Sequence, residues 1–278
     1  MSAVDDRKRI GQGFHRHAGE YDQHTIVQKR VVRHLDDLVA NHMDTANPRR
    51  LLDIGCGTGA LTAAMKNRYP QAGLFGLDLA YNMAHKTAAR VGSGAMIVNG
   101  DAECLPFRDG AFDLVVSAST FQWVRQLDVC FSECNRVLAE GGLFCTAFFG
   151  GRTLWELHES FDEAISGRWG DKSGMINRLH KFRGSSEVQQ VFEKVGFDQV
   201  VIATEVEMEY HPDVNDLLKA IKGIGANATG RSGSSGGLGW RGVLGDMAAI
   251  YRSKYRSEGM IPATYEVIYV VARKNRPA

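Results

Sequence analysis

The residues that most constrain this chain are Leu51 to Gly59, which read Leu-Leu-Asp-Ile-Gly-Cys-Gly-Thr-Gly. The apolar start of this stretch predicts a buried strand, and the glycines that follow predict a tight turn into a helix. Glycines let the backbone approach a ligand closely, and the free N–H groups at a helix N-terminus point toward it. The stretch therefore predicts a nucleotide-type pocket, although a turn that holds no ligand could have the same pattern.

The spacing of the three glycines separates this turn from dinucleotide-binding loops. Those loops follow the pattern G-x-G-x-x-G, which seats pyrophosphate on the helix N-terminus, and this chain misses that register, which disfavours a dehydrogenase. Asp53 also lies inside the strand, where its charge would repel pyrophosphate and attract a cation. The turn resembles motif I of the class I S-adenosylmethionine (SAM) methyltransferases, whose donor carries a sulfonium and an α-amino group. That resemblance implies donor contacts at Asp53, Gly55, Cys56, Gly57 and Gly59.

Composition argues against several other classes. The chain has 278 residues, 44% of them hydrophobic, and no apolar run near the roughly 18 residues of a membrane helix, so we expect a soluble globular protein. A formal net charge of +1 disfavours a strongly basic nucleic-acid binder. The charged N-terminus and the odd number of cysteines, five, predict a cytoplasmic location. The cysteines and histidines lack metal-ligand spacing, so no metal is predicted.

The second predicted strand, 74–79, supplies another acid for the pocket. Asp78 lies at its carboxyl end. Because neighbouring parallel strands place their carboxyl ends on one edge of the sheet, Asp78 can accept hydrogen bonds from ribose hydroxyls there. The same residue could cap the helix predicted from about residue 81. Leu79 and Met83 follow it and would give apolar cover to an adenine.

Two later strands are predicted to end on the same edge. Strand 95–99 precedes Asp101, and the resemblance implies that this carboxylate accepts a hydrogen bond from the adenine amino group while the adjacent backbone N–H binds the ring. Strand 112–117 leads to Trp123, for which pocket and core are equally good interpretations. The predicted donor contacts on this part of the edge are Asp101, Ala102, Ser117, Gln122 and Trp123.

The alternation of strands and helices over residues 50–149 predicts a parallel, doubly wound α/β sheet. Two more strands are predicted at 199–210 and 265–273. The resemblance implies that they complete a Rossmann-like sheet of seven strands, the last of them antiparallel.

Two insertions are predicted at the carboxyl edge of this sheet. Residues 152–183 have a helical pattern, and helices 213–224 and 240–255 are predicted in the connection between the last two strands. A connection of that length usually forms a lid or a binding element, so we expect a helical cap. The expected units are a lid segment and SAM-binding core (1–149), a first cap insertion (150–184), a core helix and strand (185–211), a second cap insertion (212–262) and the last strand with its tail (263–278).

The N-terminal region has a helical stripe that also resembles a family pattern. Phe14, Ala18, Tyr21 and Asp22 match F-x-x-x-A-x-x-Y-D, found at the front of many similar methyltransferases, where the segment folds over the donor. A short helix packed on the domain is the alternative interpretation. The helix predicted at 24–42 then presents an apolar face to the core.

Resemblance to a narrower family covers the whole chain. The stretches Leu217 to Asn227 and Pro262 to Tyr269, together with Phe121-Gln122-Trp123, are similar to those of the malonyl-[acyl-carrier protein] O-methyltransferases of biotin synthesis. This family methylates the free carboxylate of a malonyl thioester. A carboxylate is already deprotonated at neutral pH and needs no general base, in agreement with the absence of an acid–base dyad on the predicted edge. The resemblance implies an acyl-carrier protein as partner.

The residue that holds the substrate carboxylate stays open at this stage. Tyr21, His17 and Arg152 are the catalytic candidates, because each lies in a segment predicted near the edge of the sheet. The basic run 168–183 could dock an acidic carrier protein or be an ordinary solvated face. Two other interpretations share the same scaffold: a methyltransferase for another small acid or a quinone precursor, and an assembly factor that binds SAM without transferring its methyl group.

Overall fold

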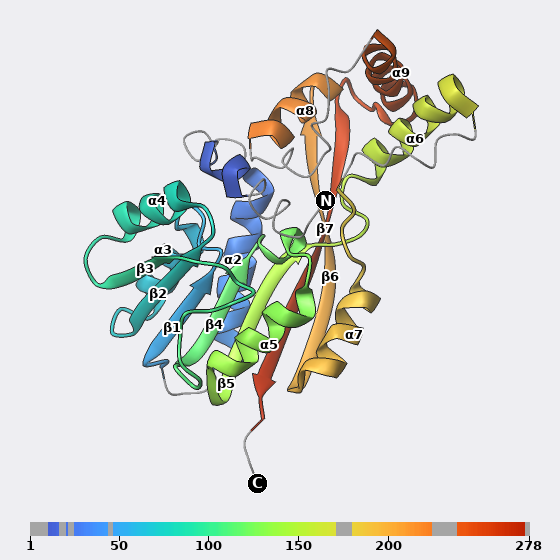
Figure 1. Cartoon of the computed structure of the whole chain (residues 1–278). Helices are drawn as coiled ribbons and strands as arrows, with labels where there is room; N and C mark the ends of the chain where they lie inside the picture. Colours follow the sequence, from blue (N-terminus) through green and yellow to red (C-terminus); the bar gives the residue numbers. More distant parts are fainter. Residues whose placement is uncertain are drawn as a thin grey trace.

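The computed structural model describes residues 11–16, 21, 25–43, 47–170, 180–223 and 238–275. Over these residues a seven-stranded sheet has the order β3-β2-β1-β4-β5-β7-β6 (Figure 1). The first five strands pair in parallel, whereas β7 runs antiparallel to both β5 and β6. The predicted Rossmann-like sheet with an antiparallel last strand is confirmed. The strands are β1 (Arg50–Ile54), β2 (Gly73–Asp78), β3 (Ala95–Asn99), β4 (Phe112–Ala118), β5 (Leu138–Phe149), β6 (Phe197–His211) and β7 (Ile261–Lys274).

Helices cover both faces of the sheet. Helices α2 (Ile26–His42) and α3 (Ala60–Arg68) contribute to one apolar core, and α5 (Leu127–Val137) and α7 (Ser185–Val195) to the other. Along β5, Cys145 and Phe149 enter the first core while Phe144 and Phe148 enter the second. Alternate residues of a strand point to opposite faces, so a sheet covered on both faces needs a nearly continuous apolar run. Helix α4 (Tyr81–Val91) packs beside α3, next to β2 and β3.

Strands β6 and β7 extend beyond the rest of the sheet. The pairing of β5 with β7 ends at Phe149 and Val267, whereas β6 and β7 remain paired as far as His211 and Ile261. A two-stranded ribbon therefore projects past the carboxyl edge. Around it lie the helices of the two insertions, α6 (Trp155–Trp169), α8 (Val214–Gly223) and α9 (Leu238–Tyr255) (Figure 1). We refer to these three helices as the cap.

The first insertion is less helical than its sequence pattern predicts. The expectation was a helical segment over 152–183, but α6 ends at Trp169 and residues 180–184 are not helical. Gly170 follows the helix with a φ of 61°, a conformation that glycine adopts at little cost. The described segment after the gap lies instead against the loop that follows β4, as the hydrogen bonds of His180 and Arg183 show.

Candidate active site

The glycine turn after β1 is shaped by the close approach of other segments. Gly55, Gly57 and Gly59 all have positive φ values, of 69°, 57° and 85°. A Cβ on Gly55 would lie 2.1 Å from Oγ1 of Thr120, so no side chain fits there. Gly59 is the N-cap of α3. The N–H groups of Gly55 and Cys56 both donate to the Leu77 carbonyl, at 2.7 and 3.0 Å, which joins the turn to β2. Gly55, Cys56 and Gly57 line the cavity, whereas Gly59 does not.

Asp53 occupies the middle of β1 and is completely buried. Its Oδ2 accepts a hydrogen bond of 2.5 Å from the Thr62 hydroxyl, while Oδ1 has no partner among the described residues. Burial, and to a lesser degree the nearby charge of Asp78, raises the pKa of Asp53 to about 7. A buried carboxylate oxygen without a hydrogen-bond partner lowers the stability of the protein unless a ligand supplies that partner. A cationic group in the adjacent cavity would do so.

Asp78 ends β2 and links the turn to α4. Its Oδ2 accepts a hydrogen bond from the Gly57 N–H and its Oδ1 accepts one from the Ala80 N–H, both at 2.8 Å. Burial raises the pKa of Asp78 to about 6. The N-cap of α4 is Ala80 and not Asp78, so the carboxylate bonds the backbone N–H of the capping residue and does not itself cap the helix. Asp78 also lines the cavity.

The turn after β3 adds the next predicted group. Asp101 accepts a hydrogen bond of 2.9 Å at Oδ1 from the Glu103 N–H, which fixes the carboxylate beside the cavity. The Asn99 side chain donates to the backbone oxygens of Asp78 and Leu79, which joins the ends of β2 and β3. The cavity wall here combines Leu79, Met83, Asp101 and Ala102.

The loop after β4 supplies polar groups two residues away from those predicted. Ser119 has a φ of 55°, and its hydroxyl has no partner among the described residues. It lines the cavity together with Thr120 and Trp123. Ser117 and Gln122, both predicted as donor contacts, do not line it: the Ser117 hydroxyl donates to the Ile54 carbonyl at 2.7 Å, and the Gln122 amide donates to the Ser119 carbonyl at 2.8 Å. Ser117 therefore joins β4 to β1, and Gln122 stabilises the loop by bonding its own backbone.

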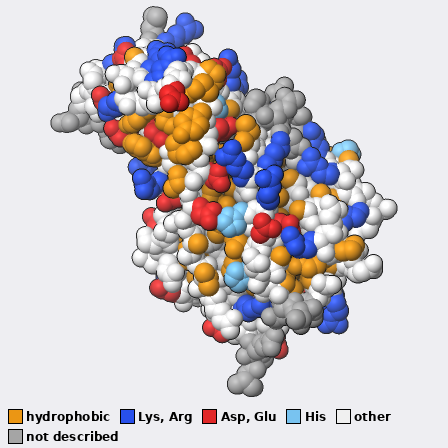
Figure 2. Space-filling model, turned by 180° about the vertical axis from the view of Figure 1, so that it is seen from behind, with side chains coloured by type: hydrophobic (Ala, Val, Ile, Leu, Met, Phe, Trp, Pro, Cys, Tyr) orange, Lys and Arg blue, Asp and Glu red, His pale blue; other side chains and the backbone are white. Residues whose placement is uncertain are grey.

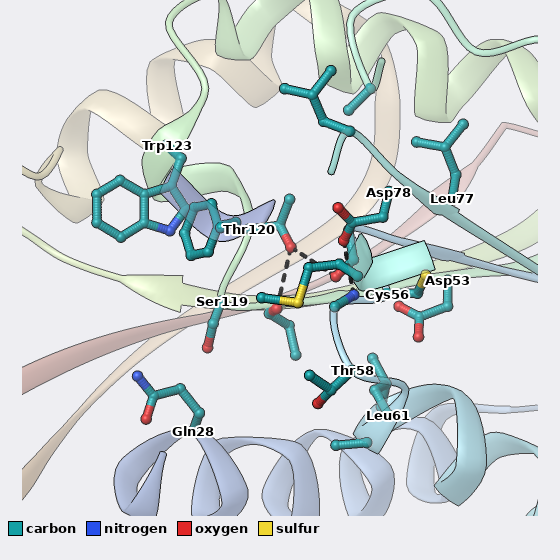
Figure 3. Close-up of a pocket in the computed structure, with 18 of the residues that line it drawn as sticks. Gln28, Asp53, Cys56, Thr58, Leu61, Leu77, Asp78, Ser119, Thr120 and Trp123 are labelled. Carbon is teal, nitrogen blue, oxygen red and sulfur yellow. Dashed lines mark hydrogen bonds between the residues drawn. The ribbon is translucent and has the colours of Figure 1, made fainter. Parts of the chain in front are cut away.

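The first turns of α2 form a wall that the sequence interpretation missed. Thr25 and Gln28 are only 3% and 8% exposed, and both line the cavity with Lys29. Figure 3 shows Gln28 on α2 and Ser119 on the loop after β4 among the residues around the cavity. Gln28 falls on the apolar stripe of α2, three residues before Val31. A polar residue inside an apolar stripe is the signal that could have revealed it.

These walls enclose a cavity of about 310 Å³ at the carboxyl edge of the parallel strands. Phe14 and Tyr21, from the N-terminal segment of the chain, also line it. Arg152 lies on an exposed turn after β5, where its N–H donates to Glu266, and does not line the cavity. His17, Ala18 and Asp22 lie outside the described residues. The predicted contacts that line the cavity are Tyr21, Asp53, Gly55, Cys56, Gly57, Asp78, Leu79, Met83, Asp101, Ala102 and Trp123.

The donor set fits SAM on its own chemistry. Buried Asp53 offers an unfilled carboxylate oxygen to an ammonium or sulfonium, and Asp78 keeps acceptor capacity for ribose hydroxyls. The apolar side chains near Asp101 suit a flat base. Among the described residues, no three His, Cys, Asp or Glu side chains are grouped as metal ligands. Over the same part of the chain, no helix is long and apolar enough to cross a membrane.

Comparison with known proteins agrees with this geometry. Residues 52–146 match the family model described as a methyltransferase domain. A malonyl-[acyl-carrier protein] O-methyltransferase of Geobacter sulfurreducens is 41% identical over 97% of this chain and 99% of the relative, and one of Brevibacillus brevis is 32% identical over 97% of each. A crystal structure from Bacillus halodurans described as that of a methyltransferase has a TM-score of 0.61 at 18% identity, covering 87% of this chain and 98% of that one, which shows the fold.

The seven-stranded sheet, the glycine turn and the acid-lined cavity define a class I SAM-dependent methyltransferase. Asp53 Oδ1 and the Ser119 hydroxyl, which have no hydrogen-bond partner among the described residues, are groups that the bound donor would engage. Because the curated relatives are similar over nearly the whole chain, this protein belongs to the malonyl-[acyl-carrier protein] O-methyltransferase family.

Proposed function

We propose that this enzyme transfers the methyl group of SAM to the free carboxylate of a malonyl thioester carried by an acyl-carrier protein. The observation that carries the proposal is the pairing of a donor cavity, lined by a buried and incompletely bonded Asp53, with near full-length similarity to proteins of that name. The product is a methyl ester, as expected for an early step of biotin synthesis.

Each wall of the cavity has a role in holding the donor. The ammonium of the methionine portion pairs with Asp53, and its carboxylate meets donors from Gln28 and Ser119. Asp78 accepts from the ribose hydroxyls, and Asp101 from the adenine amino group. The glycine turn allows the backbone to approach closely. These assignments rest on the positions of the residues around one cavity.

Methyl transfer to a carboxylate needs no general base. SAM supplies an electrophilic methyl group, and the acceptor oxygen is already ionised at neutral pH. The protein therefore contributes orientation and exclusion of water. Tyr21 is placed for this role, since it lines the cavity and packs against Phe14 at a ring distance of 6.3 Å.

Replacing Tyr21 by Phe should preserve donor affinity and reduce kcat, because the ring keeps its packing against Phe14 and only the hydroxyl is lost. Steady-state kinetics with saturating SAM would show the loss, and calorimetry with S-adenosylhomocysteine would show unchanged binding. Unchanged turnover would remove Tyr21 from the catalytic candidates.

The carrier protein as partner is part of the proposal. Of the basic run 168–183, Arg168 pairs with Asp246 and Arg183 binds backbone carbonyls, while Lys172 and Arg178 lie outside the described residues. Figure 2 shows acidic and basic side chains interspersed over the back of the molecule. Methylation neutralises the malonyl carboxylate, whose burial in an apolar pocket would be costly. The five free cysteines suit a reducing compartment, so we place the reaction in the cytoplasm.

Mass spectrometry provides the direct test. The protein is incubated with SAM and malonyl-acyl-carrier protein, and the acyl group is examined for the mass of one added methylene. Donor binding without transfer to this or any other acid would indicate an assembly factor on the same scaffold. Transfer to small free acids, with none to the carrier-linked malonyl group, would contradict the proposed substrate.

A further inference from the structure

The loop from Phe121 to Arg125 forms one wall of the donor cavity. It begins with the short 3-10 helix η2 (Phe121–Trp123), and the side chains of Trp123, Val124 and Arg125 line the cavity. The loop follows Ser119, whose φ of 55° breaks the path of β4. Its carbonyl groups therefore need partners from outside the sheet.

Those partners come from the chain that follows cap helix α6. The His180 ring is hydrogen-bonded through Nε2 to the Gln122 carbonyl at 2.8 Å. The Arg183 guanidinium donates to the Val124 carbonyl at 2.7 Å and to the Arg125 carbonyl at 2.5 Å. A planar guanidinium that bridges two successive carbonyls fixes both their distance and their direction. Residues 180–183 thus hold three carbonyls of this five-residue loop.

The same segment packs against the tryptophan of the loop. The His180 ring lies 4.9 Å from the Trp123 ring, and the Phe182 ring lies 6.1 Å from it at a steep angle. On the cavity side, Phe14 meets Trp123 edge-on at 5.7 Å. The indole is held between the N-terminal segment and the cap chain, so its orientation depends on both.

Burial favours the neutral form of His180. Its pKa lies below the usual range for histidine, chiefly because burial disfavours the charged ring, and the Arg183 and His158 charges act in the same direction. Because a carbonyl can only accept, Nε2 must carry the proton, and this fixes the tautomer. Phe182 continues the contact to Phe149 at the end of β5, at 6.3 Å.

We propose that His180 and Arg183 are positioning residues for methyl transfer, which hold the loop 121–125 and so set the orientation of Trp123 at the wall of the donor cavity. The inference rests on the proposed function, in that the donor is SAM and the reaction is methyl transfer. It assigns to the first cap insertion an effect on donor geometry, although none of the residues of α6, α8 or α9 that the structure describes lines the cavity.

The first test compares two arginines of the same insertion. Arg183→Gln should raise the KM for SAM and lower kcat, each by about tenfold, because a small displacement of a cavity wall is amplified in the rate. Arg183→Lys should fall between this variant and the wild type. The matched control is Arg168→Gln, which removes a surface pair with Asp246 away from the loop and should leave both constants within about twofold of wild type. Wild-type KM and kcat in folded Arg183→Gln would overturn the proposal.

A second pair of variants covers the case in which Arg183→Gln does not fold. His180→Gln keeps a donor for the Gln122 carbonyl, whereas His180→Ala removes both donor and ring. We expect His180→Gln to recover part of the donor affinity lost in His180→Ala, whereas a purely structural role would lower the melting temperature and leave the KM for SAM unchanged. Equal, wild-type KM values in both variants would overturn the proposal. Calorimetry with S-adenosylhomocysteine requires donor binding but no malonyl acceptor. It therefore distinguishes a failure of this positioning proposal from a failure of the proposed malonyl substrate.

Discussion

Two buried carboxyl groups, one in the donor cavity and one in a cap helix, show how the same chemistry can bind a ligand or stabilise a fold. Asp53 is fully buried and has one oxygen without a partner among the described residues. Glu156 in α6 is 2% exposed, and both of its oxygens accept from Thr264, one from the hydroxyl and one from the N–H. A buried acceptor left unfilled destabilises the protein until a ligand binds, while a filled one stabilises it directly. The comparison predicts opposite effects of mutation at the two sites.

The largest effect is expected for Asp53→Asn. The substitution removes the charge that pairs with the donor ammonium, so the affinity for SAM should fall about 100-fold, corresponding to ~3 kcal/mol. Isothermal calorimetry with S-adenosylhomocysteine measures this directly. The unfolding free energy of the ligand-free protein at pH 8 should rise or stay constant, because an ionised buried group has been removed.

Asp113 provides a matched control for this variant. Its Oδ2 accepts hydrogen bonds of 2.8 and 2.9 Å from the Arg49 and Arg50 N–H groups, and it does not line the cavity. Asp113→Asn should therefore leave donor affinity unchanged. If the two variants weakened donor binding equally, Asp53 would have no special role.

Glu156→Ala should have the opposite profile. Losing the carboxyl leaves the Thr264 N–H without this acceptor and the Thr264 hydroxyl with only the weak acceptor Met208 Sδ, so the unfolding free energy should fall by about 3 kcal/mol. Donor affinity should change less than twofold, since Glu156 does not line the cavity. Urea denaturation and calorimetry on the same preparation would decide. A tenfold loss of donor affinity with unchanged stability would contradict the contrast between the two carboxyl groups.

The pH dependence sharpens the comparison further. The pKa of Asp53 is raised to about 7 in the folded state, from 3.8 in the unfolded chain. Between these values the folded state binds more protons, so this group's contribution to stability is present at low pH and is lost as pH rises toward 7. Denaturation from pH 4 to pH 8 should show ligand-free wild type losing stability relative to Asp53→Asn, by at most ~1.4 kcal/mol per pH unit. A difference independent of pH would show that Asp53 titrates normally.

Much of the donor site could be predicted because its residues are tied to strand ends. Asp53 and Asp78 lie in or at the end of neighbouring parallel strands, and the parallel pairing of β1 with β2 brings them together. Ser119 could not be predicted in the same way, because no glycine signals the positive φ that turns its hydroxyl into the cavity. The contacts of Arg183 with the loop after β4 join segments 58 and 59 residues apart, and nothing local in the sequence specifies them.

The smallest expected effect tests the α2 wall. Gln28 faces the cavity at 8% exposure, whereas Gln189 of α7 is exposed and bonds Glu193 on its own helix. Gln28→Leu keeps the apolar stripe of α2 and removes the amide that donates to the donor carboxylate, so it should weaken S-adenosylhomocysteine binding by about tenfold, the lower end of what one hydrogen bond to a charged group contributes. The gain in buried apolar surface should leave the protein at least as stable. Gln189→Leu should change neither quantity. If Gln28→Leu bound the donor like wild type, α2 would be a wall of the cavity without a part in recognition, and the donor contacts would belong to the strand ends alone.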